Sequence, residues 1–364
     1  DVVTFYPEMQ IVIIDDNTPL TDKASAKVLS GIRTLQKESK KLTLLRTPHK
    51  HLKASALNFG LEHLISQKIK PAIIITVDDD VVINEFTFAH LISALESNKH
   101  IGAVCSMARV KNKKKNLLTR LQSLEYHGFN ITKLSDNGFL QGPLVMPGML
   151  TAFRFKVIKD IKGFSSDKLL EDYDITVRVK KAGYRTAIVS KAVAWTYAPE
   201  SLQDLARQRI RWSYGGLIVV KDFYRSGSAI FQDLIGHVLF VSLFTLVILS
   251  FIFSEGDTSP ALLIAALIGV ALLHFIFAFL FNVITLKTYP ERDKKDWLIK
   301  LSLFPEFAYS NLLSGILIGA YLFLIFNLVS HAIVNRLPIL FRLQKIGLKG
   351  FSKIGYSSAW GTRN

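Results

Sequence analysis

The sequence predicts an α/β domain followed by a helical membrane region. In residues 1–200, short apolar runs rich in β-branched residues alternate with amphipathic stretches, which is typical of a mostly parallel, Rossmann-like sheet covered by helices. From residue 229 onward, two stretches of about 25 residues carry almost no charge, and each is long enough to cross roughly 30 Å of hydrocarbon. The chain is 49% hydrophobic with a mean hydropathy of +0.29, and both values are high for a purely soluble protein.

The α/β part is predicted to contain five strands separated by four helices. Because the carboxyl ends of parallel strands meet at one edge of a sheet, ligands are expected to bind at that edge. The predicted strands are Ile11 to Ile14, Thr43 to Leu45, Ala72 to Val77, Ile101 to Ser106 and Thr186 to Val189, and the helical patterns cover 21–38, 52–67, 85–97 and 172–182.

Two apolar stretches, Ala229 to Phe253 and Ala261 to Ile284, are predicted to span a membrane. The link between them, Ser254 to Pro260, is acidic and contains no lysine, so we expect it outside the cell, whereas the basic stretch Lys287 to Lys295 belongs inside. A third apolar stretch, Phe304 to Val334, is too long for one ordinary span and too short for two, and the pattern leaves its topology open.

The segment from Arg336 to Lys353 is basic and amphipathic, which predicts a helix lying in the membrane interface. The net charge is +16 and gathers near the apolar segments and in this tail, which indicates a lipid bilayer rather than nucleic acid as the partner.

The single cysteine, Cys105, excludes a disulfide framework within the chain and fits a cytosolic catalytic half. The chain begins at Asp1 rather than Met, so we expect N-terminal sequence to be missing.

Three consecutive acids, Asp78, Asp79 and Asp80, follow the strand that ends at Val77. Two carboxylates separated by one residue can hold one divalent ion, and Mg²⁺ or Mn²⁺ bridging to diphosphate oxygens suits such hard ligands. A solvated turn after a strand is the simpler alternative.

A second acidic pair, Asp15 and Asp16, closes the first strand. Its carboxylates can accept hydrogen bonds from the uracil or ribose of a nucleotide, although a turn or a helix cap is the simpler explanation for the pair alone. Lys53, followed by Asn58, has the reach to bind a phosphate.

Glu171 and Asp172 lie at the start of a predicted helix, where the helix dipole stabilises ionised carboxylates. Asp172 is therefore a candidate general base for deprotonating an acceptor hydroxyl. Acids at a helix start are commonly just caps, and that alternative stays open.

A polar cluster precedes the first predicted span. Its cations can stabilise a leaving diphosphate and its indole can stack on a sugar ring, whereas anchoring to lipid headgroups is the alternative. The cluster comprises Gln208, Arg209, Arg211 and Trp212.

These motifs occur in the order and spacing found in processive family 2 glycosyltransferases. Over residues 8–222 the chain resembles the synthases of poly-N-acetylglucosamine, hyaluronan, chitin and cellulose, and the predicted spans extend the match. The motifs are Asp15-Asp16, Lys53 with Ala56-Leu57-Asn58, Asp78-x-Asp80, Glu171-Asp172 and Gln208-x-x-Arg211-Trp212.

The resemblance implies a GT-A fold in which Asp78 and Asp80 hold a metal on the nucleoside diphosphate and Asp172 is the base. It also implies an interfacial helix carrying the Gln-x-x-Arg-Trp motif beside the acceptor, and the region around Gly148 resembles the segment that lines the acceptor site. The tail motif with Trp360, Thr362 and Arg363 resembles a gating loop that closes over the nucleotide, the alternative being an arbitrary aromatic in a Gly/Ser tail.

If the tail gates a cytosolic site, the third apolar stretch has to re-enter or dip rather than cross once. The expected domains are 1–200 (GT-A), 201–228 (interfacial helix), 229–334 (transmembrane) and 335–364 (cytosolic tail).

The resemblance implies an inverting, UDP-sugar-dependent polysaccharide synthase of the plasma membrane with a cytoplasmic catalytic domain, and UDP-N-acetylglucosamine is the best guess for its donor. The growing polysaccharide is the expected acceptor, translocation is expected to be coupled to synthesis, and an accessory membrane subunit is a further candidate partner. A non-processive transferase that makes a glycolipid is the alternative. A membrane transporter or scaffold is disfavoured because the predicted spans contain few ionisable residues beyond His237 and His274.

Overall fold

The computed structural model describes residue 6 and residues 8–50, 52–139, 141–252 and 260–356. The chain divides into two compact units. The first contains the residues up to Met107 and Gln141–Trp195, and the second contains Ala108–Leu140 and Thr196–Tyr356.

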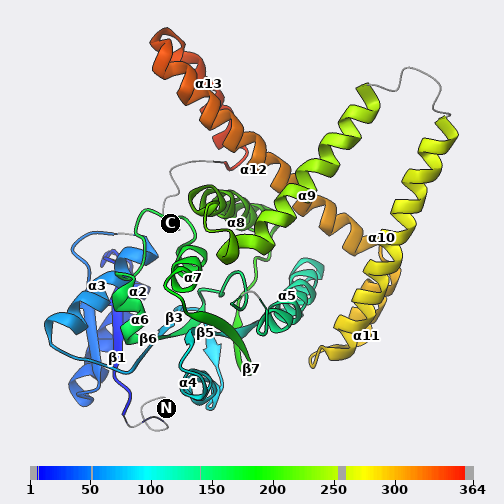
Figure 1. Cartoon of the computed structure of the whole chain (residues 1–364). Coiled ribbons are helices and arrows are strands. Elements are labelled where there is room, and N and C mark those ends of the chain that lie inside the picture. Colours follow the sequence, from blue (N-terminus) through cyan, green and yellow to red (C-terminus); the bar gives the residue numbers. More distant parts are fainter. Residues whose placement is uncertain (1–5, 7, 51, 140, 253–259, 357–364) are drawn as a thin grey trace. The chain divides into compact units, whose positions relative to one another are not determined.

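The α/β part contains every strand and helix predicted for it, together with two strands and one helix that the patterns did not predict (Figure 1). The unpredicted elements are β4, β6 and α6. In order, the elements are β1 (Ile11–Asp15), α2 (Lys23–Glu38), β2 (Leu42–Arg46), α3 (Lys53–Ser66), β3 (Ile73–Val77), β4 (Val82–Ile83), α4 (Thr87–Ser97), β5 (Ile101–Val110), β6 (Leu150–Arg154), α6 (Phe155–Asp160), α7 (Glu171–Lys181) and β7 (Arg185–Thr196).

The strands form two sheets rather than one mostly parallel sheet. β1 and β2 pair in parallel, as predicted, from Ile11 opposite Leu42 to Asp15 opposite Arg46. The other sheet has the order β3-β6-β5-β7-β4, and β6 runs antiparallel to both of its neighbours. The prediction of a mostly parallel sheet is wrong here, because the unpredicted β6 inserts between β3 and β5, and β4 also pairs antiparallel with β7.

The core of the first unit is built from the strands and the helices packed on them. Leu91 and Leu95 of α4 and Leu150 of β6 have no exposed surface, and Phe153 is almost fully buried. Cys105 on β5 is a buried free thiol, as the prediction of no internal disulfide requires.

The second unit is helical. Its long helices include both predicted spans, here α9 and α10, and the helix that carries the Gln-x-x-Arg-Trp motif, here α8. The elements are α5 (Leu117–Asp136), α8 (Leu202–Phe223), α9 (Gly227–Ile252), α10 (Pro260–Thr288), α11 (Lys294–Ser302), α12 (Phe304–Arg336), the 3₁₀ turn η1 (Pro338–Leu340) and α13 (Phe341–Lys353).

α12 is one continuous helix of 33 residues through Gly315 and Gly319. The structure therefore shows no break at these glycines, and whether α12 crosses the membrane or dips into it stays a prediction. Among the described residues, α12 alone is long and apolar enough to cross a membrane, and only 17% of its most apolar window is buried within the protein. Of the amphipathic helix predicted from Arg336 to Lys353, the structure contains α13 over Phe341–Lys353, with Phe341 and Ile346 exposed, whereas Arg336 ends α12.

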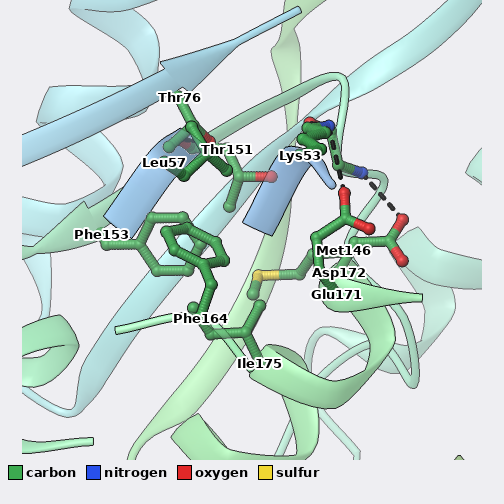
Figure 2. A pocket seen from close by; sticks show the side chains of 11 residues that line it. Lys53, Leu57, Thr76, Met146, Thr151, Phe153, Phe164, Glu171, Asp172 and Ile175 are labelled. Atoms are coloured by element: carbon green, nitrogen blue, oxygen red, sulfur yellow. Dashed lines mark hydrogen bonds and ion pairs between the residues drawn. The ribbon is translucent and has the colours of Figure 1, made fainter. Parts of the chain in front are cut away.

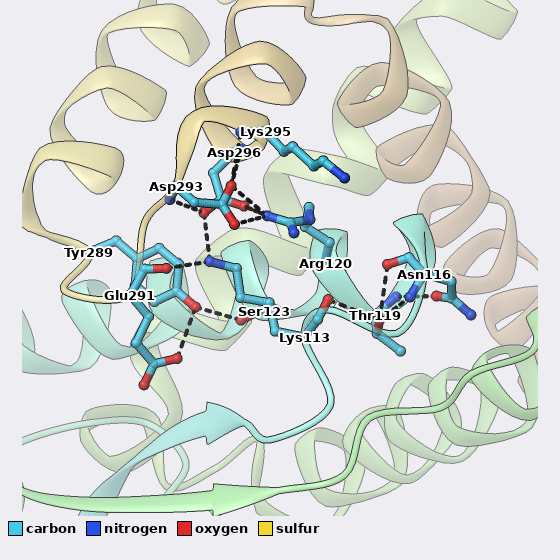
Figure 3. A network of polar contacts seen from close by, with 10 residues as sticks. All are labelled: Lys113, Asn116, Thr119, Arg120, Ser123, Tyr289, Glu291, Asp293, Lys295 and Asp296. Carbon is cyan, nitrogen blue, oxygen red and sulfur yellow. Dashed lines mark hydrogen bonds and ion pairs between the residues drawn. The ribbon is translucent and has the colours of Figure 1, made fainter.

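A buried ionic network ties α5 and the loop before it to the turn between α10 and α11 (Figure 3). Lys113 Nζ lies 2.6 Å from Asp296 Oδ2, and one nitrogen of Arg120 donates to both Asp293 and Asp296 at 2.7 Å. Asp296 is fully buried, and losing either cation would leave its charge with only one of its two ion-pair partners, which is destabilising.

Candidate active site

Lys53 brings three separate motifs of the first unit together. It is the first residue of α3, and its Nζ lies 2.6 Å from Asp78 Oδ1 after β3 and 3.2 Å from Glu171 Oε1 at the start of α7. It also donates to the carbonyl of Gly148 at 2.9 Å. Burial lowers the pKa of Lys53, but the charges of Glu171 and Asp78 outweigh this and raise it, so the ammonium stays charged.

Asp172 lies beside this cluster. Together with Lys53, Gly148 and Glu171 it lines a pocket in the first unit (Figure 2). Its Oδ2 accepts a hydrogen bond from Gly148 N–H at 3.1 Å, and its Oδ1 accepts one from Tyr173 N–H at 2.8 Å. Desolvation and the neighbouring charge of Glu171 raise the pKa of Asp172 to about 6, against the opposing effect of Lys53. A carboxylate with this pKa is ionised at pH 7 and yet basic enough to take a proton.

Gly148 is packed against both functional side chains. A Cβ added there would lie 3.0 Å from Asp172 Cβ and 3.2 Å from Lys53 Nζ. Any larger residue would have to push one of these groups away, so glycine at this position lets the loop approach the carboxylate closely enough to donate its N–H.

The start of α7 is fixed by neighbours that the sequence patterns did not reveal. Asp174 is buried and accepts from Ser165 and Arg178, both at 2.7 Å, and Thr176 accepts from Met146 N–H at 3.2 Å. Asn58, which the sequence associated with a phosphate site, instead exchanges two hydrogen bonds with the backbone of Phe164, at 2.7 and 2.8 Å. Asn58 thus joins α3 to the loop before α7.

The three acids after β3 differ in their surroundings. Asp79 is exposed, whereas Asp78 and Asp80 are partly buried. Burial raises the pKa of Asp78, with added effects from Glu171 and Asp80, while Lys53 opposes the rise. Asp78 and Asp80 are thus near enough to interact.

This pair of hard oxygen donors suits Mg²⁺ or Mn²⁺. No group of three or more His, Cys, Asp or Glu side chains able to hold a metal occurs among the described residues.

Asp15 is engaged within its own loop. It is buried, with one carboxylate oxygen accepting from Arg46 at 2.7 Å and the other from Thr18 N–H at 3.0 Å. The adjacent Asp16 accepts from Thr47 Oγ1 at 2.9 Å and is only partly buried. Of the pair, Asp16 is therefore the better placed to meet a nucleotide.

The Gln-x-x-Arg-Trp motif lies in the second unit, on α8. Arg211 is exposed and makes no ion pair with any described residue, whereas Arg209 is buried in an ion pair with Glu125. Trp212 is partly buried, and the amide oxygen of Gln208 is buried with no hydrogen-bond partner among the described residues. The predicted gating residues Trp360, Thr362 and Arg363 lie outside the described residues.

Comparison with known proteins identifies the family and the fold of the chain. The family model "Glycosyl transferase family group 2" matches residues 73–290. Poly-beta-1,6-N-acetyl-D-glucosamine synthases of Staphylococcus epidermidis and Staphylococcus aureus (strain COL) are 25% identical over 221 residues, which is 60% of this chain and 50% of theirs. The chain thus spans about half the length of these curated relatives.

A solved mannosyltransferase from Pyrobaculum calidifontis, in complex with GDP-Man and Mn²⁺, shares the fold with a TM-score of 0.51. It is 19% identical, and the likeness covers 72% of this chain and 71% of that one. This supports the GT-A fold expected from the sequence, with a mixed sheet. Since the family model matches residues 73–290 of a chain of 364, the chain belongs to glycosyl transferase family group 2.

Proposed function

We propose that the chain is a membrane-bound, inverting hexosyltransferase that extends a β-linked polysaccharide from a UDP-sugar. The observation that carries the proposal is the pocket in which Asp172, with its pKa raised to about 6, lies beside the ion cluster of Lys53, Asp78 and Glu171. A tuned carboxylate next to a fixed cation and further carboxylates is the equipment that base-assisted transfer from a nucleotide sugar requires.

In the proposed reaction the acceptor hydroxyl oxygen forms a bond to the anomeric carbon, and the bond from that carbon to the phosphate oxygen breaks. Asp172 takes the hydroxyl proton, and the nucleoside diphosphate leaves with the bonding electron pair. Asp78 and Asp80 would hold a divalent ion, which supplies charge neutralisation for the diphosphate when it is bound.

Lys53 and Arg211 are the proposed partners of the donor phosphates, and Asp16 of the nucleoside. Lys53 already lies against Asp78, so a phosphate that reaches the acids meets its ammonium. Exposed Arg211 is available for an anion in a way that buried Arg209 is not. Trp212 is proposed as the surface on which the acceptor sugar stacks.

The polymer product and the donor UDP-N-acetylglucosamine are proposed from the names of the 25% identical relatives. Two membrane spans, α9 and α10, are proposed, with the catalytic domain at the cytoplasmic face of the plasma membrane and translocation coupled to synthesis. The apolar sequences of α9 and α10 support these spans. α12 is long enough to cross as well, and a reporter placed after Asn364 would decide whether it does.

The experiment is to incubate membranes containing the chain with a panel of radiolabelled UDP-sugars and to size the product. Incorporation from one UDP-sugar into a high-molecular-weight product is expected, and Asp172→Asn should reduce it by about 10² to 10⁴. Label in a lipid-extractable product carrying one or two sugars would favour the glycolipid alternative. Absence of incorporation from every UDP-sugar by folded protein would overturn the proposal.

A further inference from the structure

Glu125 of α5, Arg209 of α8 and Tyr309 of α12 meet in the second unit. Two guanidinium nitrogens of Arg209 donate to the two oxygens of Glu125, at 3.1 and 2.6 Å. The Tyr309 hydroxyl donates to Glu125 at 2.7 Å and accepts from Arg209 at 3.4 Å. The Arg209 and Glu125 side chains are 6% and 14% exposed, so the geometry is held away from solvent.

The same guanidinium covers the indole of Trp212. Its carbon lies 4.3 Å from the ring centre, within the range in which a cation is attracted to the face of an aromatic ring. The ring of Tyr126 in α5 also lies near the indole of Trp212, and the centres of these two rings are 6.4 Å apart. Because the bidentate pair fixes the plane of the guanidinium, that plane also fixes the indole stacked on it.

This environment makes Arg209 a poor partner for a leaving diphosphate. Turning it toward a ligand would break both bonds to Glu125 and leave a buried carboxylate without its counter-charge, a strongly unfavourable change. Arg211, two residues further along α8, is exposed and makes no ion pair with any described residue.

We propose that Glu125 and Tyr309 are positioning residues that hold Arg209 against Trp212 and thereby fix the indole on which the acceptor sugar stacks. The inference rests on the proposed function for its acceptor. The clamp itself, meaning Glu125 and Tyr309 holding Arg209 against Trp212, belongs to the second unit alone. Tyr309 belongs to α12, so the clamp also ties the orientation of the indole to that helix.

The clamp is tested without catalysis by the fluorescence of Trp212 in the full chain. Subtracting the spectrum of Trp212→Phe from that of the parent isolates this indole among the four tryptophans. Glu125→Gln, Arg209→Lys and Tyr309→Phe should each change the difference spectrum and make Trp212 more accessible to iodide. Glu291→Gln is the matched control, because it removes a carboxylate that pairs with a different arginine of the same unit, Arg109, at 3.2 Å.

The proposed role of the clamp in acceptor binding is tested by kinetics with a soluble oligosaccharide acceptor. Glu125→Gln should raise the KM for the acceptor about tenfold, the size expected for a lost cation–aromatic contact, and leave the KM for the donor unchanged. Tyr309→Phe, which keeps the ring and is the milder change, should act in the same direction.

An unchanged Trp212 signal in folded Glu125→Gln protein would overturn the clamp. A changed signal with an unchanged acceptor KM would overturn its role in acceptor binding. If the parent chain transfers no sugar at all, the proposed function fails, and the fluorescence comparison still decides whether the clamp exists.

Discussion

The rate of sugar transfer should fall as the pH drops through about 6, because Asp172 must be ionised to accept the acceptor proton and its pKa is raised to about 6. With that pKa, roughly nine tenths of the molecules carry the base form at pH 7 and roughly one tenth at pH 5. Lowering the pH from 7 to 5 should therefore reduce kcat/KM about tenfold through this group alone. An aspartate at its usual value of 3.8 would lose almost nothing over the same range.

The assay is the initial rate of incorporation from a radiolabelled UDP-sugar at subsaturating acceptor, measured from pH 5 to 8 at constant ionic strength. Two variants separate Asp172 from other titrating groups. Asp172→Asn should reduce the rate by about 10² to 10⁴ and remove this acid limb from what remains. Lys53→Met should move the limb to higher pH, since the positive charge of Lys53 lowers the pKa of Asp172. An acid limb centred near pH 4, or one that persists in Asp172→Asn, would refute the assignment.

Four further outcomes are expected. Asp78→Asn or Asp80→Asn should weaken binding of the UDP-sugar in calorimetry, and EDTA should mimic either change, whereas full activity in metal-free buffer would contradict a metal at these acids. Gly148→Ala should lower turnover at least tenfold with the donor Kd nearly unchanged, because its Cβ would meet Asp172 at 3.0 Å, while Gly31→Ala, with nothing within 4 Å, should leave the rate as it is. Asp172→Asn should raise the thermal midpoint of unfolding at pH 7.5, because the raised pKa of Asp172 means that its ionised form destabilises the fold by on the order of 2–3 kcal/mol above pH 6. This destabilisation is absent below pH 4. A difference in midpoint between Asp172→Asn and the parent that is the same at pH 7.5 as below pH 4 would speak against the raised pKa. Reporters at Asp257, at Lys294 and after Asn364 should label from outside intact cells only at the first position if the tail is cytosolic.

Local sequence patterns located the elements that carry the candidate site. The β-branched runs at Ile11 and Ile73 became β1 and β3, and the acids at Glu171 became the first turn of α7, because hydrophobic periodicity and helix-start charge are local signals. Asp78 and Glu171, predicted from separate motifs, are both bound by Lys53.

Contacts between residues far apart in the sequence could not be predicted in this way. The run Leu150 to Arg154 is short and has no clear alternation, and it becomes β6 only because β3 and β5 offer edges to it on both sides. Likewise, no local pattern separates the buried Arg209 from the exposed Arg211 two residues away. The difference is made by Glu125 and Tyr309, which lie 84 and 100 residues from Arg209 along the chain.

The continuous helix α12 bears directly on whether the tail can act at the active site. At 1.5 Å per residue, its 33 residues extend about 50 Å, well beyond the roughly 30 Å of a bilayer core. A helix that crosses the membrane once has its two ends on opposite sides of the membrane. The N-terminal end of α12 follows α11, which Asp296 joins to Lys113 and Arg120, so that end lies on the same side of the membrane as α5. A single crossing would then place Trp360 across the membrane from α5 and remove it as a gate. A tail on the same side as α5 requires α12 to lie partly in the membrane interface. Such a position would suit the polar Asn327 and Ser330 of α12, which form hydrogen bonds with Tyr214 and Gln344. Labelling after Asn364 decides between these arrangements, and neither outcome alters the assignment of Asp172.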